Sequence, residues 1–140
     1  MSDIDQIQQL MNRYSEGACR RDWRQVLGTF TEDGVWSVPA RGVELTGAAA
    51  IEPAMAALVA QMDYFVQMNS AAVIEVGGNL AAARSIIREC GKFAGRDEAL
   101  EVLGQYTDEL VRTPAGWKFA RRSYTSFGVH RFALLAGPAF

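Results

Sequence analysis

The sequence predicts a single α+β domain on three observations. Near the N-terminus, apolar residues recur every three or four positions, which is typical of an amphipathic helix. From about residue 66, long stretches of strand-like composition alternate with glycine-containing turns. No repeat, linker or low-complexity tract divides the 140 residues, a length typical of one domain. Helices followed by a run of antiparallel strands define the α+β class.

Three helices are expected in the first half of the chain. Asp22 can cap the second, short helix, since Gln25 stands at its third position. An alanine-rich stretch from Gly47 to about Met62 predicts the third helix, where Pro53 must lie in the first turn or mark a kink. The first helix has one apolar stripe, formed by Ile4, Ile7, Leu10, Met11, Tyr14 and Ala18.

Strands make up most of the remainder. A turn at residues 31–34 precedes a short strand at 35–38. Hairpin turns are predicted at residues 77–79 and 113–116, and a looser turn at 95–97. Four long strands are expected at about residues 66–76, 81–93, 100–112 and 117–126.

The register of the last hairpin stays open. If Arg112 pairs with Trp117, Tyr106 faces Ser123 across the two strands. A shift by one residue instead places Tyr106 opposite Arg122. Both registers remain possible because a one-residue slip turns every side chain to the other face of the sheet.

The last stretch, residues 127–140, is apolar, and its only ionisable side chains are His130 and Arg131. A free tail would not usually expose so much apolar surface. We therefore expect this tail to cover either the mouth of a pocket or a neighbouring subunit, while residues 3–126 form the core of the domain.

Composition excludes several classes of protein. The net charge of −2 disfavours nucleic-acid binding, which needs a basic excess. No apolar run approaches a membrane span, and the acidic N-terminus is unlike a signal peptide. Two cysteines are too few for a disulfide framework, so we expect a cytoplasmic protein. With one histidine and no zinc, calcium, P-loop, Rossmann or GxSxG motif, we expect neither a metal nor a nucleotide cofactor.

The order of elements and several local motifs resemble the SnoaL-like branch of the nuclear transport factor 2-like superfamily. The resemblance covers residues 3–126 and implies a cone-shaped α+β barrel. In that barrel a strongly curved antiparallel sheet wraps around the N-terminal helices and encloses an apolar pocket. The motifs are Tyr14 followed by Arg20-Arg21-Asp22-Trp23, then FTEDGVW at 30–36, TGAAAI at 46–51, GQYTD at 104–108 and GWKF at 116–119.

Within this superfamily the sequence is most similar to scytalone dehydratase, bile-acid 7α-dehydratase and hexachlorocyclohexane dehydrochlorinase. These enzymes eliminate water or HCl without a cofactor, using an Asp–His dyad. The resemblance matches Tyr14 to a family tyrosine and Arg122 to a family arginine, and puts Tyr106 at a pocket tryptophan. The dyad positions fall on Cys19 and Gln67, so the usual base is missing.

The candidate catalytic residues are Tyr14, Cys19, Arg122 and His130, and the candidate substrate-binding residues are Trp36, Gln67, Asn69, Tyr106 and Asp108. Each has a purely structural alternative: Tyr14 and Trp36 can be core residues, Cys19 a small buried hydrophobe and Arg122 a solvated charge. Gln67 and Asn69 share one face of a strand. His130 can supply a base if the tail folds over the pocket, and Glu89 or Asp108 can replace the missing dyad.

Together these observations favour a cofactor-independent lyase or isomerase that acts on an apolar aromatic or polycyclic molecule by general acid–base catalysis. Two alternatives share the fold: a non-catalytic small-molecule-binding protein, and the small structural subunit of a ring-hydroxylating oxygenase. The resemblance and the apolar tail also lead us to expect a homodimer or homotrimer.

Overall fold

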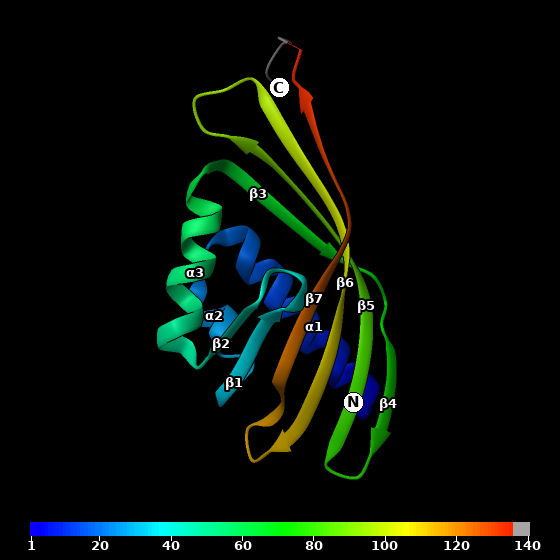
Figure 1. The fold of residues 1–140 in the computed structure, drawn as a ribbon. Coiled ribbons are helices and arrows are strands. Elements are labelled where there is room, and N and C mark those ends of the chain that lie inside the picture. The colour runs from blue at the N-terminus through cyan, green and yellow to red at the C-terminus, as the bar shows by residue number, and fades with distance from the viewer. Residues whose placement is uncertain (136–140) are drawn as a thin grey trace.

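The computed structural model describes residues 1–135, and confirms the α+β class (Figure 1). The helical elements are α1 (Asp3–Arg20), α2 (Trp23–Leu27), the 3₁₀ turn η1 (Pro39–Arg41) and α3 (Ala48–Ala60). The strands are β1 (Phe30–Val38), β2 (Val43–Thr46), β3 (Met62–Asn69), β4 (Val73–Gly77), β5 (Leu80–Phe93), β6 (Glu98–Thr113) and β7 (Gly116–Ala133). The three α-helices pack on one side of a curved sheet. Within residues 1–135 this sheet does not close into a barrel.

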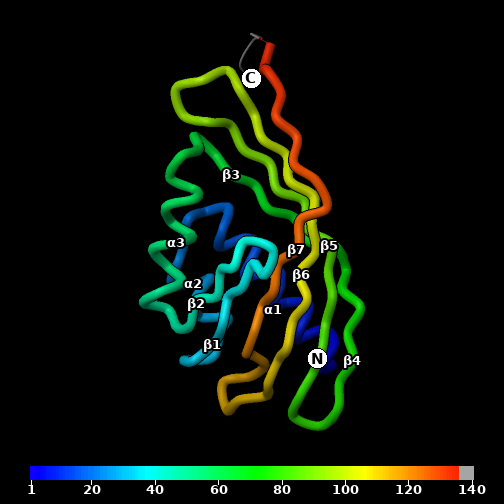
Figure 2. Tube along the Cα trace, in the orientation of Figure 1, coloured from blue at the N-terminus to red at the C-terminus, as the bar shows by residue number. Residues whose placement is uncertain are grey.

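The seven strands form one mixed sheet in the order β2-β1-β7-β6-β5-β3, with β4 paired to β5. The expected antiparallel arrangement holds for every pair except β1 and β7, which run parallel. In the tube view, β5, β6 and β7 continue past the end of α3 toward the last described residues (Figure 2). On the sheet, α1 packs mainly against β3 and also contacts β7 and β4.

Local sequence signals explain the helices. Ser2 caps α1 by accepting a hydrogen bond from the Asp5 N–H at 3.1 Å, and the Asp5 carboxylate bonds back to Ser2. Asp22 caps α2 as predicted, since the Gln25 N–H donates to its carboxylate at 3.1 Å. The α1 stripe is buried at Ile7, Leu10, Met11, Tyr14 and Ala18. Pro53 lies inside α3, beyond its first turn.

Two strand predictions are wrong. Residues 31–34, expected as a turn, belong to β1, where the pairing with β7 is interrupted between Phe30 and Val35. The chain absorbs these turn-forming residues as an irregularity of the strand. The expected strand 66–76 is two strands, because residues 70–72 separate β3 from β4.

The register of β6 and β7 differs from both expected alternatives. Arg112 does pair with Trp117. An irregularity after Leu110 and Phe119 then shifts the pairing, so that Asp108 faces Arg122 and Tyr106 faces Tyr124. The extra residue of this bulge is Ala120, which turns the following side chains to the other face. Arg122 thereby points to the buried side.

The last strand is longer than expected. β7 continues to Ala133, and residues 129–133 pair with residues 98–102 of β6. Residues 127–133 thus extend the sheet instead of folding back over its helix-covered face. Residues 136–140, with Phe140, lie outside the described part of the chain.

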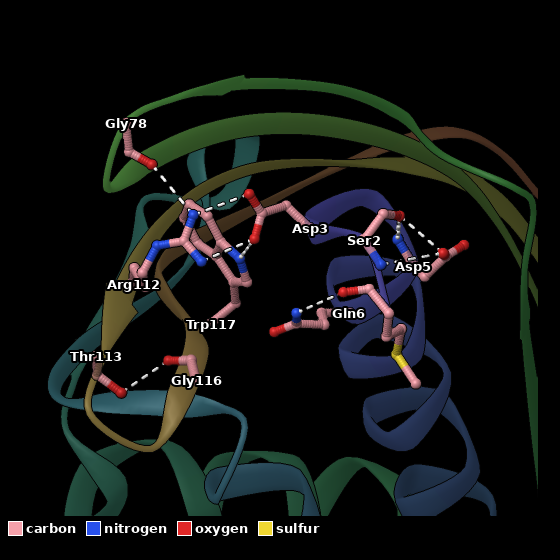
Figure 3. Close-up of polar contacts among 10 residues, drawn as sticks. Ser2, Asp3, Asp5, Gln6, Gly78, Arg112, Thr113, Gly116 and Trp117 are labelled. Carbon is pink, nitrogen blue, oxygen red and sulfur yellow. Dashed lines mark hydrogen bonds and ion pairs between the residues drawn. The ribbon is translucent and has the colours of Figure 1, made fainter.

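An ion pair joins the start of α1 to the β6–β7 hairpin, at the end of β6 and the start of β7 (Figure 3). Arg112 forms two bonds to the Asp3 carboxylate, at 2.7 and 2.9 Å, and the Trp117 indole N–H donates to it at 3.0 Å. Arg112 also reaches the Gly78 carbonyl at 3.4 Å. These bonds lower the pKa of Asp3 to about 2. No helix in residues 1–135 is long and apolar enough to cross a membrane.

Candidate functional site

A buried ion pair lies between the central strands and α1. Arg122 donates from Nε to Asp108 Oδ1 at 2.7 Å and from Nη2 to Asp108 Oδ2 at 2.9 Å. The two side chains are 0% and 1% exposed. Burial raises the pKa of Asp108 against the opposing effect of Arg122, while Asp108 keeps the pKa of Arg122 above its ordinary value despite desolvation. The pair is a charged, bidentate unit closed off from solvent.

Aromatic rings surround the guanidinium. Its Cζ atom lies 3.9 Å from the ring centre of Tyr106, 4.1 Å from that of Phe119 and 4.4 Å from that of Tyr14. This packing supplies cation–π attraction on several sides of the charge. The remaining nitrogen, Nη1, has no hydrogen-bond partner among residues 1–135. Arg122 therefore acts on the site through the rings that enclose it.

Two phenols and an indole share a short hydrogen-bond chain. The hydroxyls of Tyr14 and Tyr106 lie 2.9 Å apart, and Trp36 Nε1 donates to the Tyr106 hydroxyl at 3.2 Å. Burial raises the pKa of Tyr14 well above its ordinary value and also raises that of Tyr106. Both phenols stay protonated at neutral pH, so they can donate a proton or a hydrogen bond but cannot serve as bases.

A carboxyl group on β5 lies near these phenols. Glu89 is partly buried, and burial raises its pKa above the ordinary value. Gln67 donates from Nε2 to Glu89 Oε2 at 3.3 Å, and Ser15 in turn donates to Gln67 Oε1 at 3.1 Å. The Glu89 charge also raises the pKa of Tyr14 and Tyr106. A carboxyl with a raised pKa is a stronger proton acceptor than an ordinary glutamate.

Tyr124 completes this wall of the site. Its ring centre lies 5.4 Å from that of Tyr106, and burial, with the nearby Glu89, raises its pKa. Its hydroxyl has no partner of normal hydrogen-bond geometry among residues 1–135. The Tyr124 side chain lies over Gly104, where an added Cβ would be 2.6 Å from the Tyr124 hydroxyl. A glycine at this point of β6 is what makes room for the ring.

The structure brings five of the nine candidate residues into one cluster: Tyr14, Trp36, Tyr106, Asp108 and Arg122. Gln67 lies beside that cluster through Glu89. Cys19 instead bonds to the backbone of β3. Its sulfur accepts a hydrogen bond from the Gln67 N–H at 3.1 Å and donates one to the Gln67 carbonyl at 3.4 Å. Asn69 bonds to Asn12 at 3.1 Å in an exposed position.

His130 is not brought to the cluster. It lies on the exposed part of β7, with its side chain 61% exposed, and its Nδ1 is 3.3 Å from Glu101. Glu101 also binds Arg88 at 2.7 Å. Alternation along β6 places Glu101 on the face opposite to Tyr106 and Asp108, because its position differs from each of theirs by an odd number. The structure thus puts the base expected from the tail on the wrong side of the sheet.

Two cavities lie away from the cluster. One, of about 630 Å³, is next to the β4–β5 hairpin and is lined by Glu75, Leu80 and Glu109 with their neighbours. The other, of about 240 Å³, lies between Asp97 and Ala133 at the end of the sheet. Within residues 1–135, no three His, Cys, Asp or Glu side chains gather as a metal site would require.

Two residues of the site were not among the candidates. They are Glu89, which the sequence offers only as a replacement for the missing dyad, and Tyr124. Counting by twos along β5 from Ser85, which is buried and pairs with Tyr106, would have put Glu89 on the inner face. Tyr124 faces the site only because of the bulge at Ala120, and the sequence carries no signal for that bulge.

A curved sheet packed against an N-terminal helix, with a buried polar cluster between them, defines a nuclear transport factor 2-like fold. The chain belongs within it to the SnoaL-like family, whose model matches residues 1–123. It is 29% identical over 126 residues to an uncharacterized protein of Mycobacterium tuberculosis, covering 89% of this chain and 86% of that one.

Two solved structures from Novosphingobium aromaticivorans are similar over most of the chain. The first is a "putative aromatic ring hydroxylase" with 27% identity and a TM-score of 0.83, covering 93% of both chains. The second is a "putative scytalone dehydratase" with 22% identity and a TM-score of 0.82, covering 100% of both. The second likeness shows the shared fold alone.

Proposed function

We propose that this protein is a cofactor-independent lyase or isomerase for an apolar aromatic or polycyclic molecule, with Glu89 as its general base. The observation that carries the proposal is the Glu89 carboxyl itself. It is partly buried beside protonated phenols, one of its oxygens is held by Gln67, and its pKa is raised by burial. The family dyad is absent, because its two positions fall on Cys19 and Gln67. In this proposal Glu89 supplies the proton acceptor in its place.

The proposed chemistry divides acid and base between two sides of the site. In an elimination or isomerisation, Glu89 takes a proton from a carbon of the substrate, while a phenol of the Tyr14–Tyr106 pair donates a hydrogen bond to the oxygen where negative charge develops. The protonated Glu89 then returns the proton, either to the leaving hydroxide, which departs as water, or to another carbon. In a retro-aldol cleavage, Glu89 instead takes the hydroxyl proton, the C–C bond breaks to release a one-carbon aldehyde, and the protonated Glu89 protonates the carbanion. The positive field of Arg122 acts from behind the rings of both tyrosines.

The packed cluster has a consequence for binding. Tyr124 is less buried than Tyr106, so we propose that a substrate reaches the cluster beside Tyr124. Ligand binding and stabilisation of the fold are then linked, since a ligand present at 100 times its dissociation constant stabilises the folded state by about 2.7 kcal/mol.

The test is a thermal-shift screen of aromatic diols, hydroxylated polyketides and sterols, followed by product analysis for every hit. Glu89→Gln keeps the shape of the side chain and removes the base, so turnover should fall about 10²-fold or more while binding persists. Glu75→Gln is the matched control, because Glu75 is exposed on β4. Equal turnover in wild type and Glu89→Gln would reject Glu89 as the base.

A second candidate is a subunit of a ring-hydroxylating oxygenase, favoured by the 27% identity to the ring-hydroxylase-like protein. It requires a large partner subunit. Light scattering of the purified chain separates the two: we propose a homodimer or homotrimer that is stable alone. Ligand binding without any product would instead favour a non-catalytic binding protein on this fold.

A further inference from the structure

A count of hydrogens in the Trp36–Tyr106–Tyr14 chain shows that one of them has no acceptor. The indole N–H and the two phenolic O–H groups supply three hydrogens, but only two hydrogen bonds join the three side chains. No other acceptor bonds to either hydroxyl among residues 1–135. A buried donor without a partner costs free energy, so this hydrogen is a place where a ligand atom can bind.

The chain's direction follows from what each group can do. Trp36 can only donate, so the Tyr106 oxygen accepts from it. Either hydroxyl can donate in the bond between Tyr14 and Tyr106. We assign Tyr14 as the donor, because its ring packs against Phe30 and Phe119, each 6.1 Å away between ring centres, whereas the ring of Tyr106 packs against Tyr124. This assignment leaves the unpaired hydrogen on Tyr106.

The surroundings of Tyr106 are polar where those of Tyr14 are not. Its ring packs against Tyr124, whose hydroxyl has no hydrogen-bond partner of normal geometry among residues 1–135, and the Glu89 charge reaches Tyr106. Accepting two hydrogen bonds polarises its own O–H and makes it a stronger donor. The Arg122 guanidinium, 3.9 Å from the ring centre, favours negative charge nearby.

We propose that Tyr106 donates the hydrogen bond that a ligand oxygen accepts, with Trp36 and Tyr14 orienting its hydroxyl and Arg122 acting from behind the ring. This inference rests on the proposed function and deepens it, since it selects ligands with an acceptor oxygen, such as a carbonyl or a phenolate. Simple hydrocarbons and alkyl halides would leave the hydrogen unpaired. Tyr106 touches the ligand, whereas Trp36, Tyr14 and Arg122 are positioning residues.

The test uses 4-nitrophenol, whose anion absorbs visible light, bound to the full-length protein. Tyr106→Phe and Tyr14→Phe form the matched pair, each made in a Glu89→Gln background so that the carboxylate charge does not mask the effect. Tyr106→Phe should weaken binding of the nitrophenolate roughly tenfold to a hundredfold. Tyr14→Phe should weaken it only a few-fold, since Tyr106 keeps its own hydrogen and the Trp36 bond.

The pH at which bound 4-nitrophenol ionises gives a second, spectroscopic readout. It should rise on Tyr106→Phe and, by a smaller amount, on Trp36→Phe, which remains informative if Tyr106→Phe does not fold. An equal or larger loss in Tyr14→Phe, or no binding at millimolar nitrophenol before the tyrosines are changed, would overturn the inference. The proposed function fails separately: nitrophenol behaves as expected, but no compound is turned over.

Discussion

Asp108 and Arg122 form a bidentate ion pair across β6 and β7, with N–O distances of 2.7 and 2.9 Å and almost no exposure to solvent. The pair exists because the bulge at Ala120 turns Arg122 inward, opposite Asp108. Loss of either partner of such a pair destabilises the folded state strongly, because it leaves the other charge buried without compensation.

Asp108→Asn should therefore destabilise the fold by about 3–5 kcal/mol, measured by chemical denaturation. Replacing both partners together by Leu and Met should cost much less, because no charge remains buried. Glu44→Gln is the control: it removes an exposed partner of Arg121, 2.7 Å away, and should change stability by less than about 1 kcal/mol. A small effect of Asp108→Asn would show that the Arg122 charge is solvated in solution.

Glu89 should make stability depend on pH. Its pKa in the folded state is raised, so the folded protein binds this proton more tightly than the unfolded chain does. The free energy of unfolding contributed by Glu89 is therefore greatest below the ordinary Glu pKa of about 4.3 and falls as pH rises through the raised value.

Glu89→Gln does not titrate, so relative to wild type it should become more stable as pH rises through that window. Each unit of pKa shift corresponds to about 1.4 kcal/mol. Denaturation curves of both proteins between acid and neutral pH measure the difference. Glu75→Gln should track wild type throughout, and a flat difference for Glu89→Gln would mean that Glu89 is solvated.

Gly104→Ala should destabilise the protein by about 1–3 kcal/mol, because the added Cβ would meet both the Tyr124 hydroxyl and the Thr125 carbonyl oxygen at 2.6 Å. Removing the hydroxyl with Tyr124→Phe should not restore stability, since the backbone oxygen remains. Gly128→Ala on β7 is the matched control, as nothing lies within 4 Å of its added Cβ. Thermal unfolding compares the variants, and an unchanged melting temperature for Gly104→Ala would contradict the placement of the Tyr124 ring.

Asp3→Asn should lower the melting temperature at neutral pH, because it weakens the bonds from Arg112 and Trp117 that hold α1 to the sheet. The pKa of Asp3 in the folded protein is about 2, below its ordinary value. Its stabilising effect is thus complete above about pH 4 and is lost as pH falls through 2. Asp33→Asn is the control. Melting curves at neutral pH and near pH 2 should show the difference between Asp3→Asn and wild type disappearing in acid.

Local rules predicted much of the fold. The apolar stripe of α1, the Asp22 cap and the glycine turns act over a few residues, so their signals can be recognised in the sequence. The same holds for the long strands β5 and β6, whose alternation is regular. The turn-forming residues 31–34 gave a wrong prediction because the pairs on either side of them, Phe30 with Phe119 and Val35 with Arg121, keep β1 continuous across the irregularity.

The sequence by itself determined the α+β class, the family, and a set of candidate site residues that includes Tyr14, Tyr106, Asp108 and Arg122. Only the tertiary structure decided which of them meet. The bulge at Ala120 selects the partners of Asp108 and Tyr106, and the pairing of β3 with β5 sets Gln67 against Glu89. The physical reason is that one extra residue in a strand reverses which face every later side chain occupies, and long-range pairing, not local sequence, determines where that residue is accommodated.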